Sequence, residues 1–128
     1  MNETPKTILV VDDQRHQIET LCRGLFLFGY TCRGATGIEE ASAILSRDPK
    51  PDLMITDLSR LELSGIMLIK SAIKLCPEMP ILVIIGLART DVISEAQALG
   101  IPILQKPFSP PALAEAIRAQ LTPNSSDE

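Results

Sequence analysis

Aromatic residues are scarce in this chain of 128 residues, where they make up 3%, and tryptophan is absent. This scarcity disfavours stacking platforms for nucleic-acid bases and aromatic clefts for sugars. Positive charge is not in excess either, because 12 Lys and Arg side chains against 16 Asp and Glu give a net charge of −4. A mainly electrostatic grip on nucleic acid or on an anionic membrane is therefore disfavoured, and we expect neither partner.

The chain has few cysteines and no long apolar run. Cys22, Cys32 and Cys76 are odd in number, lie far apart and form no C-x-x-C pair. We interpret them as reduced, partly buried thiols, with a zinc site and a disulfide framework both disfavoured. No apolar run reaches a bilayer-spanning length, and the first residues do not have the pattern of a signal peptide. These features predict a cytoplasmic protein.

The composition that is present is that of a globular domain. Hydrophobic residues make up 45% of the chain and charged residues 22%, which excludes a disordered or collagen-like protein. The length suits one domain, which we place at residues 1–122. The small polar residues at 123–128 predict a flexible tail.

Short apolar runs predict the strands. Those at 7–11, 53–55, 81–85 and 101–104 are rich in β-branched residues and continuous, which is typical of strands covered on both faces of a parallel sheet. Pro102 favours an edge position for the last run, because proline cannot donate a ladder hydrogen bond. A more polar run at 30–33 is predicted to form the other edge.

Segments with helical spacing separate these runs, at 14–28, 38–46, 64–75 and 91–99. A last helix is predicted to begin at Pro110 behind a Ser109 cap, and Gly29 and Gly100 are expected to end two others. The order is β-α repeated five times. With right-handed crossovers it predicts a doubly wound α/β fold, a parallel sheet in the order 2-1-3-4-5 between two helical layers.

Charged residues follow the carboxyl ends of three predicted strands. Asp12 and Asp13 follow the first, Asp57 the third and Lys106 the fifth. In an open α/β sheet these ends share one edge, and ligands bind there, at the crevice where the strand order reverses. We therefore expect the four residues to meet in one site. Taken singly, Asp12 or Asp13 would only cap the next helix, and Lys106 would be an ordinary surface lysine.

Three gathered carboxylates repel one another, and a divalent cation relieves the repulsion. An all-oxygen site with few protein ligands suits Mg²⁺, which keeps several of its waters. With Lys106 as a second positive charge, such a site is suited to receiving a phosphoryl group on a carboxylate. Asp57 is the candidate nucleophile, because the third strand places it between the other charges.

From about Lys6 to Leu121 the chain resembles the receiver domain of two-component response regulators. The resemblance is carried by residues 8–13, 51–58, 64–65 and 106–108. It implies a flavodoxin-like, CheY-like three-layer sandwich whose Asp57 is phosphorylated by a sensor histidine kinase or a phosphotransfer protein. Such a protein is not an enzyme beyond its own phosphorylation and dephosphorylation. The resemblance leaves the downstream protein partner unknown and a homodimer open.

The resemblance also implies roles for the site residues. Asp13, Asp57 and the backbone carbonyl of Ser59 would ligate Mg²⁺, and Asp12 would act mainly through water. Lys106 would contact the phosphoryl group, and the Lys106–Pro107 peptide bond would be cis.

Three positions depart from the usual family pattern. The Thr or Ser expected at the end of the fourth strand is Ile85, the Tyr or Phe expected three residues before the lysine is Ile103, and the proline expected four residues after the phosphoacceptor is Leu61. The backbone N–H of Gly86 is left to bind the phosphoryl group, with the cation and Lys106. We expect phosphoryl transfer to survive and signal transmission to be altered, because alkyl groups cannot sense an anion.

Other functions fit the residues less well. A degenerate receiver that acts as a phosphorylation-independent interaction module is favoured by the two isoleucines and disfavoured by the complete charged set. A Mg²⁺-dependent phosphatase would need a further acid or base near the nucleophile, where Ser59 lies two residues after Asp57. FMN binding would need a phosphate loop after the first strand, where two aspartates lie. His16, the single histidine, is interpreted as a surface residue.

Overall fold

The computed structural model describes residues 5–58, 63–86 and 90–121, in which strands and helices alternate. The strands are β1 (Thr7–Val11), β2 (Thr31–Ala35), β3 (Leu53–Asp57), β4 (Ile81–Ile85) and β5 (Ile103–Gln105). The helices are α1 (Arg15–Leu27), α2 (Ile38–Leu45), α3 (Leu63–Leu75), α4 (Thr90–Ala98) and α5 (Pro110–Leu121). The predicted β-α alternation is confirmed.

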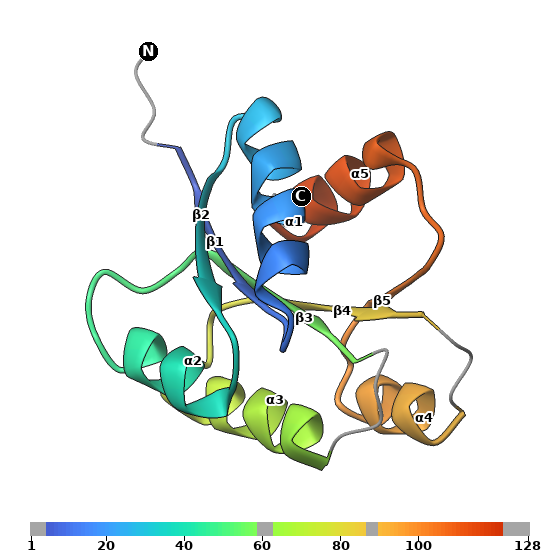
Figure 1. Ribbon diagram of the computed structural model, residues 1–128. Helices are drawn as coiled ribbons and strands as arrows, with labels where there is room; N and C mark the ends of the chain where they lie inside the picture. The colour runs from blue at the N-terminus through green and yellow to red at the C-terminus, as the bar shows by residue number, and fades with distance from the viewer. Residues whose placement is uncertain (1–4, 59–62, 87–89, 122–128) are drawn as a thin grey trace, which may run out of the picture.

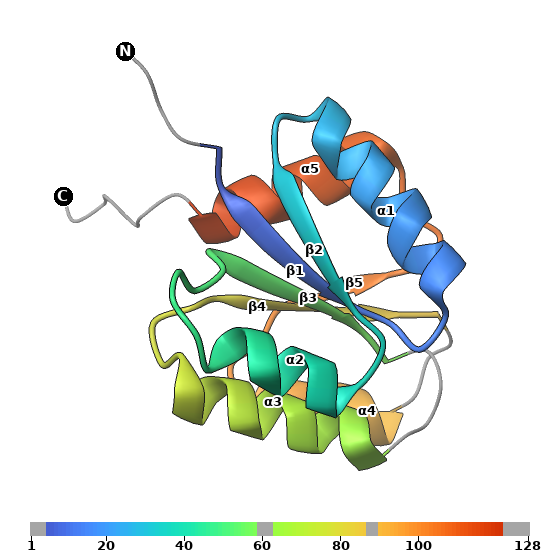
Figure 2. The same cartoon turned by 60° about the vertical axis from the view of Figure 1, so that its left-hand side comes forward.

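The strands form one five-stranded parallel sheet in the order β2-β1-β3-β4-β5. Helices α1 and α5 cover one face of this sheet, and α2, α3 and α4 cover the other (Figure 1). Figure 2 shows the same three layers from a second side. The doubly wound α/β fold and its strand order are therefore confirmed, and β2 and β5 are the edges as predicted.

The continuous apolar runs reflect burial on both faces. Along β1, Ile8 and Val10 pack in the core beneath α1 and α5, whereas Leu9 and Val11 pack in the core beneath α2, α3 and α4. Every residue of β4 is buried. Since successive strand residues point to opposite faces, a strand that lies between two helical layers needs apolar residues at every position.

Several predicted boundaries hold. Gly29 and Gly100 follow α1 and α4 with φ angles of 95° and 73°, in the left-handed region that glycine adopts without strain. Ser109 caps α5, since its Oγ accepts a hydrogen bond of 3.1 Å from the backbone N–H of Ala112. The Lys106–Pro107 peptide bond is cis, as expected.

Three strands differ from their predicted ranges, and one of them, β3, continues to Asp57, two residues beyond the apolar run that ended at 55. Strand β2 continues to Ala35, beyond the polar run that ended at 33. Strand β5 begins at Ile103 and not at 101. The carbonyl of Pro102 still accepts a 3.0 Å hydrogen bond from the N–H of Val83, but its ring has no N–H to donate, so the regular ladder starts one residue later.

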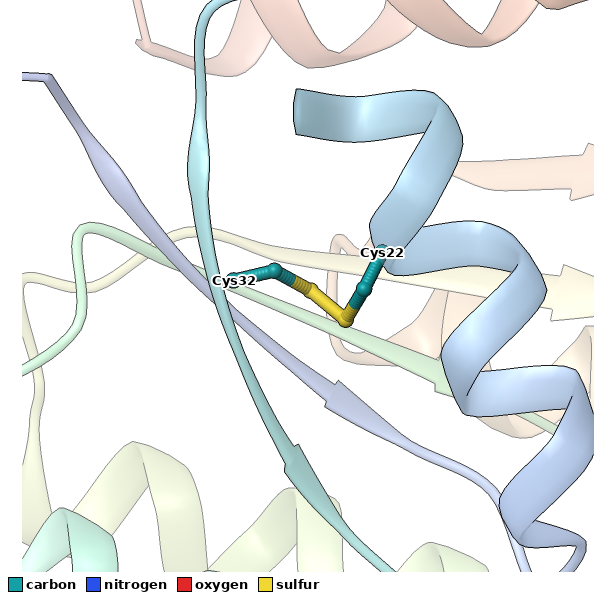
Figure 3. Close-up of a disulfide and its surroundings, with 2 residues drawn as sticks. All are labelled: Cys22 and Cys32. Atoms are coloured by element: carbon teal, nitrogen blue, oxygen red, sulfur yellow. A yellow bond between two sulfur atoms is a disulfide. The ribbon is translucent and has the colours of Figure 1, made fainter. Parts of the chain in front are cut away.

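The prediction of three reduced cysteines is wrong for two of them. Cys22 of α1 and Cys32 of β2 form a disulfide with a Cα–Cα distance of 5.5 Å (Figure 3). They lie ten positions apart, but the chain reverses at Gly29, so the edge strand returns alongside the helix that precedes it. Cys76 is a free, buried thiol whose pKa is raised by burial.

Candidate functional site

The carboxyl edge of the sheet brings the predicted charged residues together. Asp12, Asp13, Asp57 and Lys106 all line one cavity of about 120 Å³. Asp12 and Asp13 follow β1, Asp57 ends β3 and Lys106 follows β5. The rule that parallel strands end at a shared edge thus locates this site from the sequence.

Asp57 and Lys106 form the central ion pair. Lys106 Nζ lies 2.7 Å from Asp57 Oδ2, and the side chains are 34% and 13% exposed. Partial exclusion of water strengthens attraction between such charges relative to a fully exposed pair. The site therefore holds an ammonium group directly against a carboxylate that is largely shielded from water.

Strand β4 fixes the backbones that carry this pair. The N–H of Leu58, directly after Asp57, donates a 2.7 Å hydrogen bond to the carbonyl of Ile84. The N–H of Lys106 donates a 2.8 Å hydrogen bond to the carbonyl of Ile85. Two adjacent residues of one buried strand thus position the carboxylate and the ammonium group.

Asp12 is a helix-entry residue and a site residue at once. Its Oδ1 accepts a 2.9 Å hydrogen bond from the N–H of Gln14, which forms a turn just before α1. Gln14 is itself the N-cap of this helix and no side chain caps it, so neither aspartate is the helix cap. Burial, and then the neighbouring charges of Asp57 and Asp13, raise the pKa of Asp12, while the bond from Gln14 opposes the rise. The crowding of negative charge expected from the sequence is therefore present.

The loop after β2 forms a further wall that sequence analysis missed. Thr36 and Gly37 line the same cavity as the carboxylates. The backbone N–H and the hydroxyl of Thr36 donate hydrogen bonds of 2.6 and 3.0 Å to Glu40 Oε1, and these bonds lower the pKa of Glu40. The strand-end rule that located the aspartates applies equally to β2 and is the signal that could have identified this loop.

Gly65, near the start of α3, also lines the cavity. A Cβ atom at this position would collide with the side chain of Leu58, which follows Asp57 along the chain. Glycine therefore allows α3 to approach the end of β3 closely. This is a physical reason for a glycine in the stretch 64–65, which resembles the receiver family.

The donor set fits a hard cation. The acidic ligands present are carboxylate oxygens, which suit Mg²⁺, and the cavity leaves room for the waters this ion retains. Within the described ranges, no three His, Cys, Asp or Glu side chains are already arranged to hold an ion by themselves. Ser59, the other expected ligand, lies outside the described residues.

Two of the positions that depart from the expected family pattern carry isoleucines, and both are packed in the core. Ile85 is completely buried in the core beneath α2, α3 and α4, and Ile103 packs against the same cluster. Gly86 follows Ile85 and is half-buried. The third departure, Leu61, lies outside the described residues.

A second, larger opening adjoins the site on the other face of the sheet. This groove, of about 460 Å³, runs between α1 and α5 and shares Asp12, Asp57 and Lys106 with the smaller cavity. Its remaining walls are mainly apolar and include Leu21, Phe28, Phe108 and Leu113. His16 lies at this groove and is exposed, which agrees with its interpretation as a surface residue.

Comparison with known proteins shows which family the chain is similar to. The family model "Response regulator receiver domain" matches residues 8–118. The phosphate regulon transcriptional regulatory protein PhoB of Pseudomonas aeruginosa is 32% identical over 119 residues, which are 91% of this chain and 52% of that protein. The response regulator MprA of Mycobacterium leprae is 33% identical over 126 residues, 94% of this chain and 53% of that protein. The chain therefore spans about half the length of these curated relatives.

Solved structures show the same likeness. A receiver domain protein (CheY-like) from Methanospirillum hungatei superposes with a TM-score of 0.85 at 25% identity, covering 98% of this chain and 100% of that one. A receiver protein from Pseudomonas putida gives 0.81 at 30% identity, covering 92% and 99%. No described helix is both long and apolar enough to span a bilayer. The chain belongs to the response regulator receiver domains of two-component signalling, a family that does not consist of classical enzymes.

Proposed function

We propose that this receiver accepts a phosphoryl group on Asp57 from a phosphohistidine of a sensor kinase or phosphotransfer protein. The observation that carries the proposal is the 2.7 Å pair between Lys106 Nζ and Asp57 Oδ2 inside a cavity lined by two further aspartates. A carboxylate held beside an ammonium group and next to a cation-binding set is the arrangement that anion transfer requires. We place this function in the cytoplasm.

In the transfer, a carboxylate oxygen of Asp57 attacks phosphorus while the bond from phosphorus to the donor nitrogen breaks. Lys106 then contacts the phosphoryl oxygens and offsets their charge, and the N–H of Gly86 donates a further hydrogen bond. Asp12, Asp13, Asp57 and the Ser59 carbonyl are the residues that would hold Mg²⁺. When bound, this ion supplies positive charge against the transferring group and relieves repulsion among the carboxylates.

The donor needs a path to an acceptor that is only 13% exposed. The groove between α1 and α5 reaches Asp57 and Lys106, and its apolar walls offer surface to a protein that brings the phosphohistidine. We therefore assign the donor to this side of the molecule. The downstream protein is a second, separate partner.

We further propose that the output step is atypical. In the usual switch a hydroxyl moves toward the phosphoryl group and an aromatic ring follows it inward, whereas here two isoleucines pack in one core cluster. Neither side chain can form a hydrogen bond with the added anion, and moving buried Ile85 would open a cavity. Phosphorylation then leaves this part of the core in place.

Intact-mass measurement with acetyl phosphate tests the acceptor. With Mg²⁺ present we expect the mass of one phosphoryl group to be added, and we expect neither Asp57→Asn nor a chelator-treated sample to gain it. An unmodified mass under saturating donor would instead support the interaction-module alternative, which the packed isoleucine pair also favours.

NMR with a beryllofluoride mimic tests the switch. We expect shift changes at residues lining the acceptor cavity and none around Ile103 or along α5. Ile85→Thr restores a hydroxyl at the end of β4 and should extend the perturbed region beyond the cavity. Changes that already reach α5 in the unmodified protein would contradict an atypical switch.

A further inference from the structure

We propose that the Cys22–Cys32 disulfide is a reversible redox clamp that controls how firmly α1 and β2 are held beside the acceptor site. The bridge joins the helix after β1 to an edge strand, as Figure 3 shows. Both cysteines are half-buried and pack against the core beneath α1 and α5, whereas the third cysteine, Cys76, is buried and lies outside the bridge.

The segment that the bridge secures includes an edge strand, which is otherwise held by its ladder with β1 and by the packing of α1. Strand β2 pairs with β1 alone, and Thr31, Arg33 and Gly34 within it are exposed. Noncovalent packing of α1 on this strand includes a close approach of Ile18 to Gly34, where a Cβ atom would collide with the isoleucine side chain. Because an edge strand is paired on one side only, it opens more readily than an inner strand, and we expect a covalent bond to α1 to add to its local stability.

The clamped elements lead directly into the site. Strand β2 runs on to Thr36 and Gly37, which line the acceptor cavity, while α1 begins just after Asp12 and Asp13. The opposite face of α1 supplies one wall of the groove between α1 and α5. The bridge therefore links the two elements, α1 and β2, whose adjoining loops line the acceptor cavity.

The chemistry is thiol–disulfide exchange with a dithiol reductant of the thioredoxin class. A reductant thiolate attacks one sulfur of the bridge and forms a mixed disulfide, which the second reductant thiol then resolves. The reductant ends as a disulfide, and two protons and two electrons arrive on Cys22 and Cys32. A low-molecular-weight disulfide such as oxidised glutathione drives the reverse reaction.

We expect the disulfide to form and break reversibly because of the compartment in which the protein works. Reducing compartments keep protein thiols reduced, so a disulfide in a protein that works there is typically transient and redox-sensing. This step rests on the proposed cytoplasmic function of the receiver. The geometry of the bridge does not depend on that function.

The test combines thiol counting with hydrogen exchange on the intact chain. Samples equilibrated natively in buffers of graded dithiol-to-disulfide ratio are quenched, unfolded and alkylated, and their masses are measured. We expect one modified thiol at the oxidising end, three at the reducing end, and superposable curves from both directions. In the reduced form, amides of α1 and β2 should exchange at least about tenfold faster, while those of β3 and β4 keep their rates.

Two variants complete the design. The double variant Cys22→Ser/Cys32→Ser should exchange like the reduced protein in every buffer, and Cys76→Ser should retain the full redox response. A bridge that never forms, one that yields only after denaturation, or equal exchange in α1 and β2 for both forms would overturn the proposal. None of these readouts involves phosphorylation, so a failure here is distinct from a failure at Asp57.

Discussion

The negative charge of Asp12 destabilises the folded, metal-free protein. Partial burial and the carboxylates of Asp57 and Asp13 raise its pKa above the ordinary value of 3.8. The folded state thus keeps this proton longer than the unfolded state, and stability falls as pH rises from 3.8 through the folded pKa. At neutral pH the metal-free protein has lost the full amount of this stability.

Asp12→Asn should therefore stabilise the metal-free protein at neutral pH by about 0.5–1 kcal/mol, allowing for solvent screening. The Asn oxygen can still accept the hydrogen bond from Gln14, so the turn is retained. Urea denaturation in a chelator measures the change, and Glu19→Gln, at an exposed α1 position, is the control of equal charge. A lower stability in Asp12→Asn would show that the charge of Asp12, partly buried and next to other carboxylates, does not destabilise the metal-free protein.

A second prediction for a single residue concerns Lys106. Lys106→Ala removes the ammonium group 2.7 Å from the acceptor and should slow phosphorylation by acetyl phosphate by about 10²-fold, the typical effect of one lost charge-stabilising donor. Lys70→Ala, on the exposed side of α3, should react at the unmodified rate. Equal phosphorylation rates for the two variants would show that Lys106 does not take part in phosphoryl transfer.

The start of α2 shows how one element responds to pH. The backbone N–H of Thr36, and then its hydroxyl, hold the pKa of Glu40 below 4.5. Because this folded pKa is lowered, the contribution to stability is complete above 4.5 and is lost as pH falls through the folded value.

An NMR titration of the Glu40 carboxyl should therefore give a midpoint below 4.5. In Thr36→Val the backbone donor remains and the hydroxyl is lost, so the midpoint should move only part of the way back. A full return of the pKa to 4.5 in that variant would show that the hydroxyl, and not the backbone N–H of Thr36, causes the lowering.

The elements also show what a sequence pattern can and cannot predict. Strands β1, β3 and β4 were predictable because burial on both faces demands an unbroken apolar run. The ends of β2 and β5 were not, because edge strands tolerate polar residues and proline, and backbone pairing decides where they stop. For the same reason Thr36 and Gly37 escaped notice behind a strand that sequence analysis ended too early.

At the scale of the whole molecule, topology explains both the success and the error. One rule about strand ends gathered Asp12, Asp13, Asp57 and Lys106 from three distant parts of the chain. The disulfide was missed because cysteine spacing says nothing about which elements lie side by side. The return of β2 next to α1 brings two Cα atoms to 5.5 Å, within the range that a disulfide spans.

Loss of that covalent link should weaken the fold as a whole. Cys22→Ser/Cys32→Ser should lower the free energy of unfolding by about 2–3 kcal/mol relative to the oxidised protein, as expected for a short closed loop. Chemical denaturation without reductant measures the difference, with Cys76→Ser as the variant that keeps the bridge. Equal unfolding free energies for the double variant and the oxidised protein would deny the bridge a stabilising role.

The most direct test of the acceptor site is to locate the phosphoryl group. The protein is treated with acetyl phosphate and Mg²⁺, the acyl phosphate is reduced with borohydride to the corresponding alcohol, and the peptides are sequenced by mass spectrometry. The account predicts a single reduced side chain, at Asp57, and none in the Asp57→Asn variant. A mark on Asp12, on Asp13 or on no residue at all would contradict it.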